Sequence, residues 1–194
     1  CTDGQYIYVS RTTDLEEEKT VRCIMVSKYD ANTYELIASA PLSADASCEA
    51  NAGITYYDGK IIIYYNNGTK WWIDPSLTGE WAEYTGFAFE DTENSAIRDV
   101  YYNVASDQFA VFIGEKVTIY GMDMKAITSF NFKSESGGLK SARMTASNDY
   151  IYVTFNKDTV YKPTVQVYDW NGNYVGRFVA PNSTDIYGTT TSTN

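Results

Sequence analysis

One stretch of the chain, Val165–Val175 (VQVYDWNGNYV), decides the fold class. Its centre is the dipeptide Asn171-Gly172, which is typical of a tight hairpin turn because glycine supplies the positive φ that such a turn needs. Apolar residues stand on both sides of it. The stretch therefore predicts a β-hairpin formed by Val165–Tyr168 and Tyr174–Phe178.

Similar hairpins are predicted at three earlier places in the chain. They pair Ile24–Tyr29 with Tyr34–Ala38, Trp71–Ile73 with Glu80–Tyr84, and Val117–Tyr120 with Ala126–Phe130. The equivalent positions in the four copies are Tyr29, Ile73, Tyr120 and Tyr168. Successive positions are about 44, 47 and 48 residues apart, the length of a repeat with four strands.

A second kind of hairpin precedes each of these. Its apolar runs, each following a turn signal rich in Asp, Asn, Ser or Gly, are Tyr6–Val9, Ile61–Tyr64, Phe109–Phe112 and Tyr150–Val153. Three copies have an apolar strand before that turn: Ala52–Tyr57, Ile97–Val104 and Lys140–Ala146. Two turn regions match closely, Val104–Phe109 (VASDQF) and Thr145–Tyr150 (TASNDY). Continuous apolar runs without polar alternation predict strands that are covered on both faces.

These features predict an all-β fold, a β-propeller of about four antiparallel blades with four strands each. We assign residues 1–194 to one domain, with blades at 1–42 plus 185–192, 48–86, 95–132 and 138–180. Helix should make up less than about a tenth of the chain, with no long helix through Ser43–Asn51 or Phe87–Ala96.

The first repeat is one strand short, because only Cys1 and Thr2 precede its Asp-Gly turn. We expect the C-terminal stretch Asp185–Ser192 to pair with Gln5–Ser10 and close the ring, which removes open sheet edges. The alternative is that the chain is a fragment of a larger propeller.

Two stretches carry a resemblance to a known family. Val165–Val175 and Tyr29–Ile37 (YDANTYELI) resemble the outer-hairpin motif of NHL-like and related bacterial or phage β-propeller repeats. The resemblance covers essentially the whole chain. It implies a propeller that acts as a binding platform, and it transfers no functional residues.

Composition excludes several classes of function. The 194 residues carry a net charge of −10, which argues against nucleic acid as a partner because such binding depends on Lys and Arg. The longest apolar runs, near Ile61–Tyr65 and Phe109–Ile113, are too short for membrane insertion. Cys1, Cys23 and Cys48 have no metal-ligand spacing, and both a disulfide and buried thiols stay open. Nothing in the sequence predicts an oligomeric state.

Catalytic motifs are not recognisable. The chain has no His, which removes Ser-His-Asp and Cys-His arrangements and the commonest zinc ligand. We therefore predict no catalytic residues, no metal and no cofactor. Carboxylate pairs are what remains, because glycoside hydrolysis needs only two of them. Asp99 lies on a predicted inner strand, and Glu49, Glu90 and Asp91 lie in loops; solvated loop charges are the favoured interpretation of these acids.

Recognition is expected at one end of the blades, where long and dissimilar connections gather. These are Arg11–Val21, Asn66–Lys70, Asn156–Pro163, Leu42–Asn51, Phe87–Ala96 and Lys133–Leu139. The aromatic residues near them, Tyr65, Trp71, Trp72 and Tyr161, are the candidate ligand contacts, because flat rings stack on sugars or anchor protein interfaces. Trp71 and Trp72 are adjacent and point to opposite faces of one strand, so at least one of them packs within a blade.

The leading hypothesis is a non-enzymatic module that binds a protein or glycan through this long-loop face. Its expected location is extracellular, at a cell envelope or on a virion surface. The first alternative is a carbohydrate-active enzyme, or the accessory domain of one, that uses a carboxylate pair. The second is a structural domain of a larger surface or virion assembly.

Overall fold

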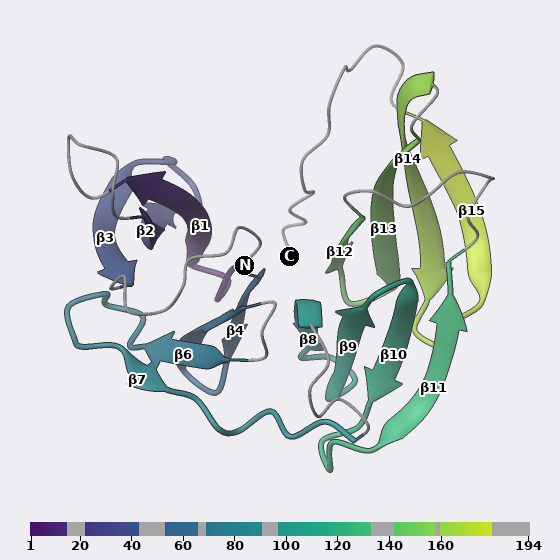
Figure 1. The fold of residues 1–194 in the computed structure, drawn as a ribbon, viewed down its shortest axis with the longest axis horizontal. Helices are drawn as coiled ribbons and strands as arrows, with labels where there is room; N and C mark the ends of the chain where they lie inside the picture. The colour runs from purple at the N-terminus through teal and green to yellow at the C-terminus, as the bar shows by residue number, and fades with distance from the viewer. Residues whose placement is uncertain are drawn as a thin grey trace. The chain divides into compact units, whose positions relative to one another are not determined.

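The computed structural model describes residues 1–14, 22–42, 53–65, 69–90, 97–132, 142–157 and 160–179. These residues form antiparallel strands and turns, and they contain no helix (Figure 1). This part of the chain accordingly has no helix that is long and apolar enough to cross a membrane.

The strands build four sheets, one after another along the chain. The first sheet contains β1 (Tyr6–Asp14), β2 (Arg22–Asp30) and β3 (Leu36–Leu42). The other three sheets contain β4 (Gly53–Tyr57), β5 (Lys60–Tyr64), β6 (Lys70–Ile73) and β7 (Ala82–Glu83); β8 (Ile97–Asn103), β9 (Gln108–Ile113), β10 (Lys116–Tyr120) and β11 (Ala126–Asn131); and β12 (Arg143–Ala146), β13 (Tyr150–Lys157), β14 (Val160–Asp169) and β15 (Tyr174–Val179). Strands are hydrogen-bonded in chain order within every sheet. The predicted fold class, an all-β propeller of four blades, is confirmed.

The chain divides into two compact units, which hold β1–β7 and β8–β15. In the first unit, Tyr8 and Val26 of the first sheet share a core with Ile61, Ile63 and Ile73 of the second. The two sheets pack against each other because each has an apolar face.

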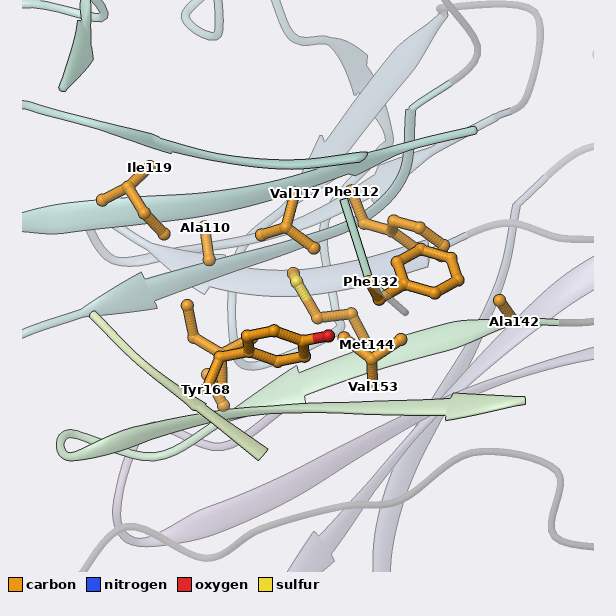
Figure 2. Packing of buried hydrophobic residues seen from close by; sticks show 11 residues of the cluster. Ala110, Phe112, Val117, Ile119, Phe132, Ala142, Met144, Val153 and Tyr168 are labelled. Atoms are coloured by element: carbon orange, nitrogen blue, oxygen red, sulfur yellow. The ribbon is translucent and has the colours of Figure 1, made fainter. Parts of the chain in front are cut away.

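The second unit is built in the same way. Met144, Val153 and Tyr168 of the fourth sheet face Ala110 and Val117 of the third (Figure 2). Each unit therefore has its own core between two blades.

In two of the blades, the second strand is buried on both faces. Ile61, Ile62 and Ile63 of β5 are all 0% exposed, and Phe109–Phe112 of β9 is equally inaccessible. The prediction from continuous apolar runs is thus confirmed for two of the four runs. In the other two, Val9 and Tyr150 are each 40% exposed, so those strands are not fully covered on both faces.

The strand registers confirm the predicted equivalence of the outer hairpins. Tyr29, Ile73, Tyr120 and Tyr168 pair with Ile7, Ile61, Phe109 and Ile151, respectively. The sequence alignment of Val104–Phe109 with Thr145–Tyr150 is shifted by one residue relative to the structure. In the strand registers, Phe109 is equivalent to Ile151 and not to Tyr150. The inner turns differ in length: Asp58-Gly59 joins Tyr57 directly to Lys60, whereas residues 104–107 separate Asn103 from Gln108.

An aspartate begins three of the four outer turns. Oδ1 of Asp30 accepts the backbone N–H groups of Asn32 and Thr33 at 2.8 and 2.9 Å, and Oδ1 of Asp169 accepts that of Asn171 at 2.9 Å. Asp74 accepts the N–H of Ser76 in the same way. These bonds lower the carboxyl pKa values, led by the backbone of Thr33 for Asp30 and by the Asn173 side chain for Asp169.

Each outer turn is completed by one residue with positive φ. These residues are Tyr34 (59°), Leu77 (59°), Met124 (61°) and Gly172 (82°). The outermost strand of three sheets then carries one extra residue, a β-bulge, at Ile37, Ile127 and Val175. These three side chains are 53%, 57% and 55% exposed.

Two predicted loops are partly strand. β1 continues to Asp14, where it pairs with Arg22, so much of Arg11–Val21 belongs to a ladder. β13 runs to Lys157 and β14 begins at Val160, where these two residues pair, so the described residues of Asn156–Pro163 belong to strands as well. The prediction was wrong here because polar strand ends that project beyond the core have no apolar pattern.

The predicted loop Phe87–Ala96 is also packed where it is described. Phe87 contacts Tyr57 and Tyr84 on the second sheet, with ring centroids 5.7 and 5.0 Å apart. Phe89 contacts Phe109 and Tyr120 on the third sheet, at 5.5 and 4.8 Å. Each phenyl ring is 2% exposed. No helix occurs in Phe87–Glu90, and Ser43–Asn51 lies outside the described residues.

The first sheet has three strands, as the one-strand deficit predicted. Cys1 and Thr2 contribute a short stub, in which the Tyr8 N–H donates to Cys1 O at 2.8 Å and Thr2 bridges to Ile7. The predicted closing strand, Asp185–Ser192, lies outside the described residues.

Tyr34 offers a test of the outer-turn geometry. Its side chain is 72% exposed and its φ is 59°. A residue with a side chain is destabilised by about 1–2 kcal/mol in this conformation, and glycine avoids that cost. Roughly half of the resulting stabilisation is lost again, because glycine has a greater conformational entropy in the unfolded chain. We expect Tyr34→Gly to raise the free energy of unfolding by about 0.5–1 kcal/mol, measured by urea denaturation.

Gly172→Ala is the matched control. Gly172 has a φ of 82°, and an added Cβ would lie 3.1 Å from Cδ1 of Phe130, so this change should lower the free energy of unfolding. A loss of stability in Tyr34→Gly as large as that in Gly172→Ala would contradict the account.

Candidate functional site

The two ends of each sheet differ in their connections. The turns between the first and second strands and between the third and fourth strands lie at one end, called here the short-turn end. The second-to-third connection and the entry to the first strand lie at the other, called the long-loop end. Inner strands β8 and β12 therefore begin at the long-loop end of the second unit.

Three charged residues meet where these two strands begin. Arg98 and Asp99 are the second and third residues of β8, and Arg143 is the first residue of β12. The register of β8 shifts between Ile97 and Asp99, which makes Arg98 the extra residue of a β-bulge. A bulge re-aims side chains, and here Arg98 and Asp99 are both half-buried although they are adjacent.

Asp99 connects the two strands. Its Oδ2 accepts the backbone N–H of Met144 at 2.9 Å, and Nη1 of Arg143 lies 3.4 Å from its Oδ1. The Asp99 side chain is 15% exposed and that of Arg143 is 31% exposed. The carboxylate therefore holds Arg143 at the edge of solvent.

Burial raises the pKa of Asp99 to about 6. Arg143, the Met144 N–H and Arg98 act in the opposite direction, because each favours the charged form. Desolvation outweighs them. No second carboxylate contributes to the shift, so within the described residues Asp99 is one half of an ion pair and not of a carboxylate pair.

Arg98 makes a weaker contact. Its guanidinium carbon lies 6.0 Å from the centroid of the Phe112 ring, at the outer limit of a cation–π interaction. The group of Arg98, Asp99 and Arg143, called here the inner-strand charged site, thus carries two positive charges and one titratable carboxyl.

Of the other acids predicted as candidates, only Glu90 is described, and it does not join this site. The Glu90 N–H donates to Met124 O at 3.0 Å, which places Glu90 beside the outer turn of the third sheet. Glu49 and Asp91 lie outside the described residues. Within the described ranges, no three Cys, Asp or Glu side chains are grouped so as to hold a metal ion.

The four predicted aromatic contacts have different environments. Trp71 packs against the core of the first unit, whereas Trp72 lies on the opposite face with Lys60 Nζ 5.5 Å from its ring centroid. Tyr65 is 1% exposed and belongs to the same core as Trp71. Tyr161 is in β14, and its side chain lies outside the description.

The four aromatic residues differ in whether a ligand could reach them. The two Trp rings do point to opposite faces, as predicted for adjacent strand residues. Contact between Tyr65 and a ligand would require the core to open, which argues against Tyr65 as a ligand contact. The roles of Trp72 and Tyr161 stay predictions.

Sequence reasoning singled out Asp99 but missed Arg98 and Arg143. A signal was present, because the pair Arg98-Asp99 interrupts an otherwise apolar inner strand. Arg143 had no such local signal, since its contact with Asp99 joins residues 44 positions apart.

The raised pKa of Asp99 predicts a pH dependence of stability. Between pH about 4 and 6 the folded chain binds more protons at Asp99 than the unfolded chain, where the pKa is 3.8. The contribution of Asp99 to the free energy of unfolding therefore falls as pH rises through this window. We expect Asp99→Asn to remove that fall, measured as the urea midpoint at pH 4, 5, 6 and 7.

Asp123→Asn, at an exposed turn of the same sheet, is the control and should keep the wild-type profile. The lowered pKa values of Asp30, Asp74 and Asp169 act below pH about 4, outside the window. An unchanged decline in Asp99→Asn would contradict the assignment.

Comparisons with known proteins show similarity in structure but not in sequence. No family model matches the chain. No curated protein sequence matches it either. Among solved structures, the chain is similar to a protein of unknown function from Bacteroides caccae, with 9% sequence identity and a TM-score of 0.44 over 91% of this chain. The chain spans 58% of the length of that neighbour.

Proposed function

We propose that this protein is a non-enzymatic recognition module that binds a glycan or protein ligand at the long-loop end of its blades. The observation that carries the proposal is the inner-strand charged site. Arg98, Asp99 and Arg143 are partly exposed at that end, and two of them are fixed by contacts between adjacent blades. Pre-positioned polar groups on a rigid scaffold lower the entropy cost of binding.

The propeller architecture supports this proposal. Its blades are rigid stacked sheets, whereas the connections between strands can vary without disturbing the cores. The strands that begin at the long-loop end of the second unit bring together residues far apart in the chain, as binding sites on such scaffolds commonly do.

One observation favours a second candidate, a carbohydrate-active enzyme. A carboxyl group with a pKa of about 6 is partly protonated near neutral pH, as a general acid must be. Glycoside hydrolysis also needs a second carboxylate about 5–10 Å away. The groups that act on Asp99 are arginines and a backbone N–H, which suits an ion pair better than an acid–base pair.

A glycan array and a pull-down of surface proteins with the intact protein test the first candidate. We expect at least one ligand, whose binding is weakened by Arg143→Ala at the long-loop end. Tyr34→Ser, at the short-turn end of a sheet in the other unit, should leave binding unchanged because it alters only an exposed turn. The fold of both variants is checked by thermal unfolding.

Two results would overturn this proposal. The first is the absence of any ligand in both screens, and the second is a ligand lost in Tyr34→Ser but retained in Arg143→Ala. Release of reducing sugar by the wild type, abolished in Asp99→Asn, would establish the enzyme instead.

A further inference from the structure

The inner-strand charged site has an excess of positive charge in an acidic protein. The whole chain has a net charge of −10, yet two guanidinium groups act on the one carboxyl at this site. The charges of these three described residues sum to +1 when Asp99 is ionised and to +2 when it is protonated. A site of this sign, surrounded by an acidic molecule, favours an anionic group of a ligand.

The carboxylate of Asp99 is already engaged. One of its oxygens accepts the Met144 N–H, and the other faces Arg143 at the long distance of 3.4 Å. Within the described residues, the guanidinium of Arg143 makes no polar contact other than the one with Asp99, and that of Arg98 contacts only the Phe112 ring. Most of the guanidinium N–H donors therefore have no protein acceptor in that part of the chain.

Arginine is suited to a particular kind of anion. Its planar fork of donors matches the two oxygens of a carboxylate and can bind both at once. The bulge at Arg98 sets this residue on the same accessible stretch as Asp99. Two arginines from neighbouring blades can therefore bind one ligand carboxylate from two sides, with Asp99 holding Arg143 in place.

The surroundings favour a sugar over a protein as the carrier of that carboxylate. The apolar neighbours Ile97, Val100 and Met144 are only 4%, 4% and 7% exposed. A protein interface requires accessible apolar or aromatic anchors, and none of these three residues supplies one. Exposed apolar residues of this unit are at the short-turn end, such as Val104 and Met122, or on the outermost strands β11 and β15, such as Ile127 and Phe178, and none of these is on an inner strand. A site whose described residues offer polar groups and no accessible apolar anchor suits a polar ligand.

We propose that Arg98 and Arg143 bind the carboxylate of a hexuronate residue in an acidic glycan. This inference rests on the proposed function and specifies its ligand. Asp99 is a positioning residue in this site, because it orients Arg143 and adjusts the charge presented to the ligand.

Calorimetric titration with two pairs of probes tests the inference. The pairs are galacturonate trisaccharide with its neutral methyl ester, and hyaluronan tetrasaccharide, which contains glucuronate, with its carboxyl-methylated form. We expect the wild type to bind at least one acidic probe at least tenfold more tightly than its ester. The affinity should fall as NaCl is raised, because the contact is between charges.

Variants separate recognition from a purely structural role. Arg98→Gln should weaken binding at least tenfold while leaving the Asp99–Arg143 contact intact. Asp99→Asn should strengthen binding, because it removes the negative charge that competes with the ligand for both arginines, while the amide oxygen of the isosteric side chain can still accept from Arg143. Arg177→Gln, which alters an exposed arginine on β15, is the matched control and should bind like the wild type. Opposite effects of Arg98→Gln and Asp99→Asn cannot arise from a shared loss of folding.

Several outcomes would overturn the inference. They are equal affinity for an acidic probe and its ester, unchanged affinity in Arg98→Gln, or no binding of either acidic probe. If the wild type then binds another ligand in the array or pull-down, the proposed function stands and only the hexuronate assignment fails. If no ligand of any kind is found, both fail.

Discussion

The fold depends on covering both faces of the apolar strands β5 and β9, one in each unit. A single sheet with a wholly apolar central strand is unstable in water, so each blade needs an apolar layer on either side. Within each unit, the facing blade covers one side of that strand. On the second sheet, Phe87 contacts the side turned away from the first sheet, and Phe89 does the same on the third sheet relative to the fourth. The connection between units thus places one phenyl ring on a sheet of each unit.

Features that depend on local contacts could be predicted from sequence, whereas features that depend on the neighbouring blade could not. The outer hairpins were recognised because two local signals coincide, an apolar strand and an aspartate whose carboxylate accepts N–H groups of its own turn. The inner turns were harder to align. Asn103, which is 0% exposed, donates to Asn148 O at 3.0 Å and accepts the Ala105 N–H, so its place depends on the next blade.

The candidate site shows the same division between local and distant causes. Asp99 could be placed on an inner strand from its apolar neighbours alone. Its partners are the backbone of Met144 and the side chain of Arg143, and both come from the next repeat. The bulge at Arg98 depends on how β8 pairs with β9, which no local pattern encodes. Tyr65 was expected near a loop but is buried, because the apolar run of β5 continues one residue beyond the strand.

The bulges at Ile37, Ile127 and Val175 bear on solubility. Each outermost strand has one unpaired side of N–H and C=O groups, which could template the addition of a strand from another molecule. An extra residue near the start of the strand interrupts the regular spacing of those groups and increases the local twist. An approaching strand with ordinary spacing cannot stay in register along the whole edge. The repeated bulge therefore protects against edge-to-edge aggregation, even though it leaves an apolar side chain exposed in each of these three blades.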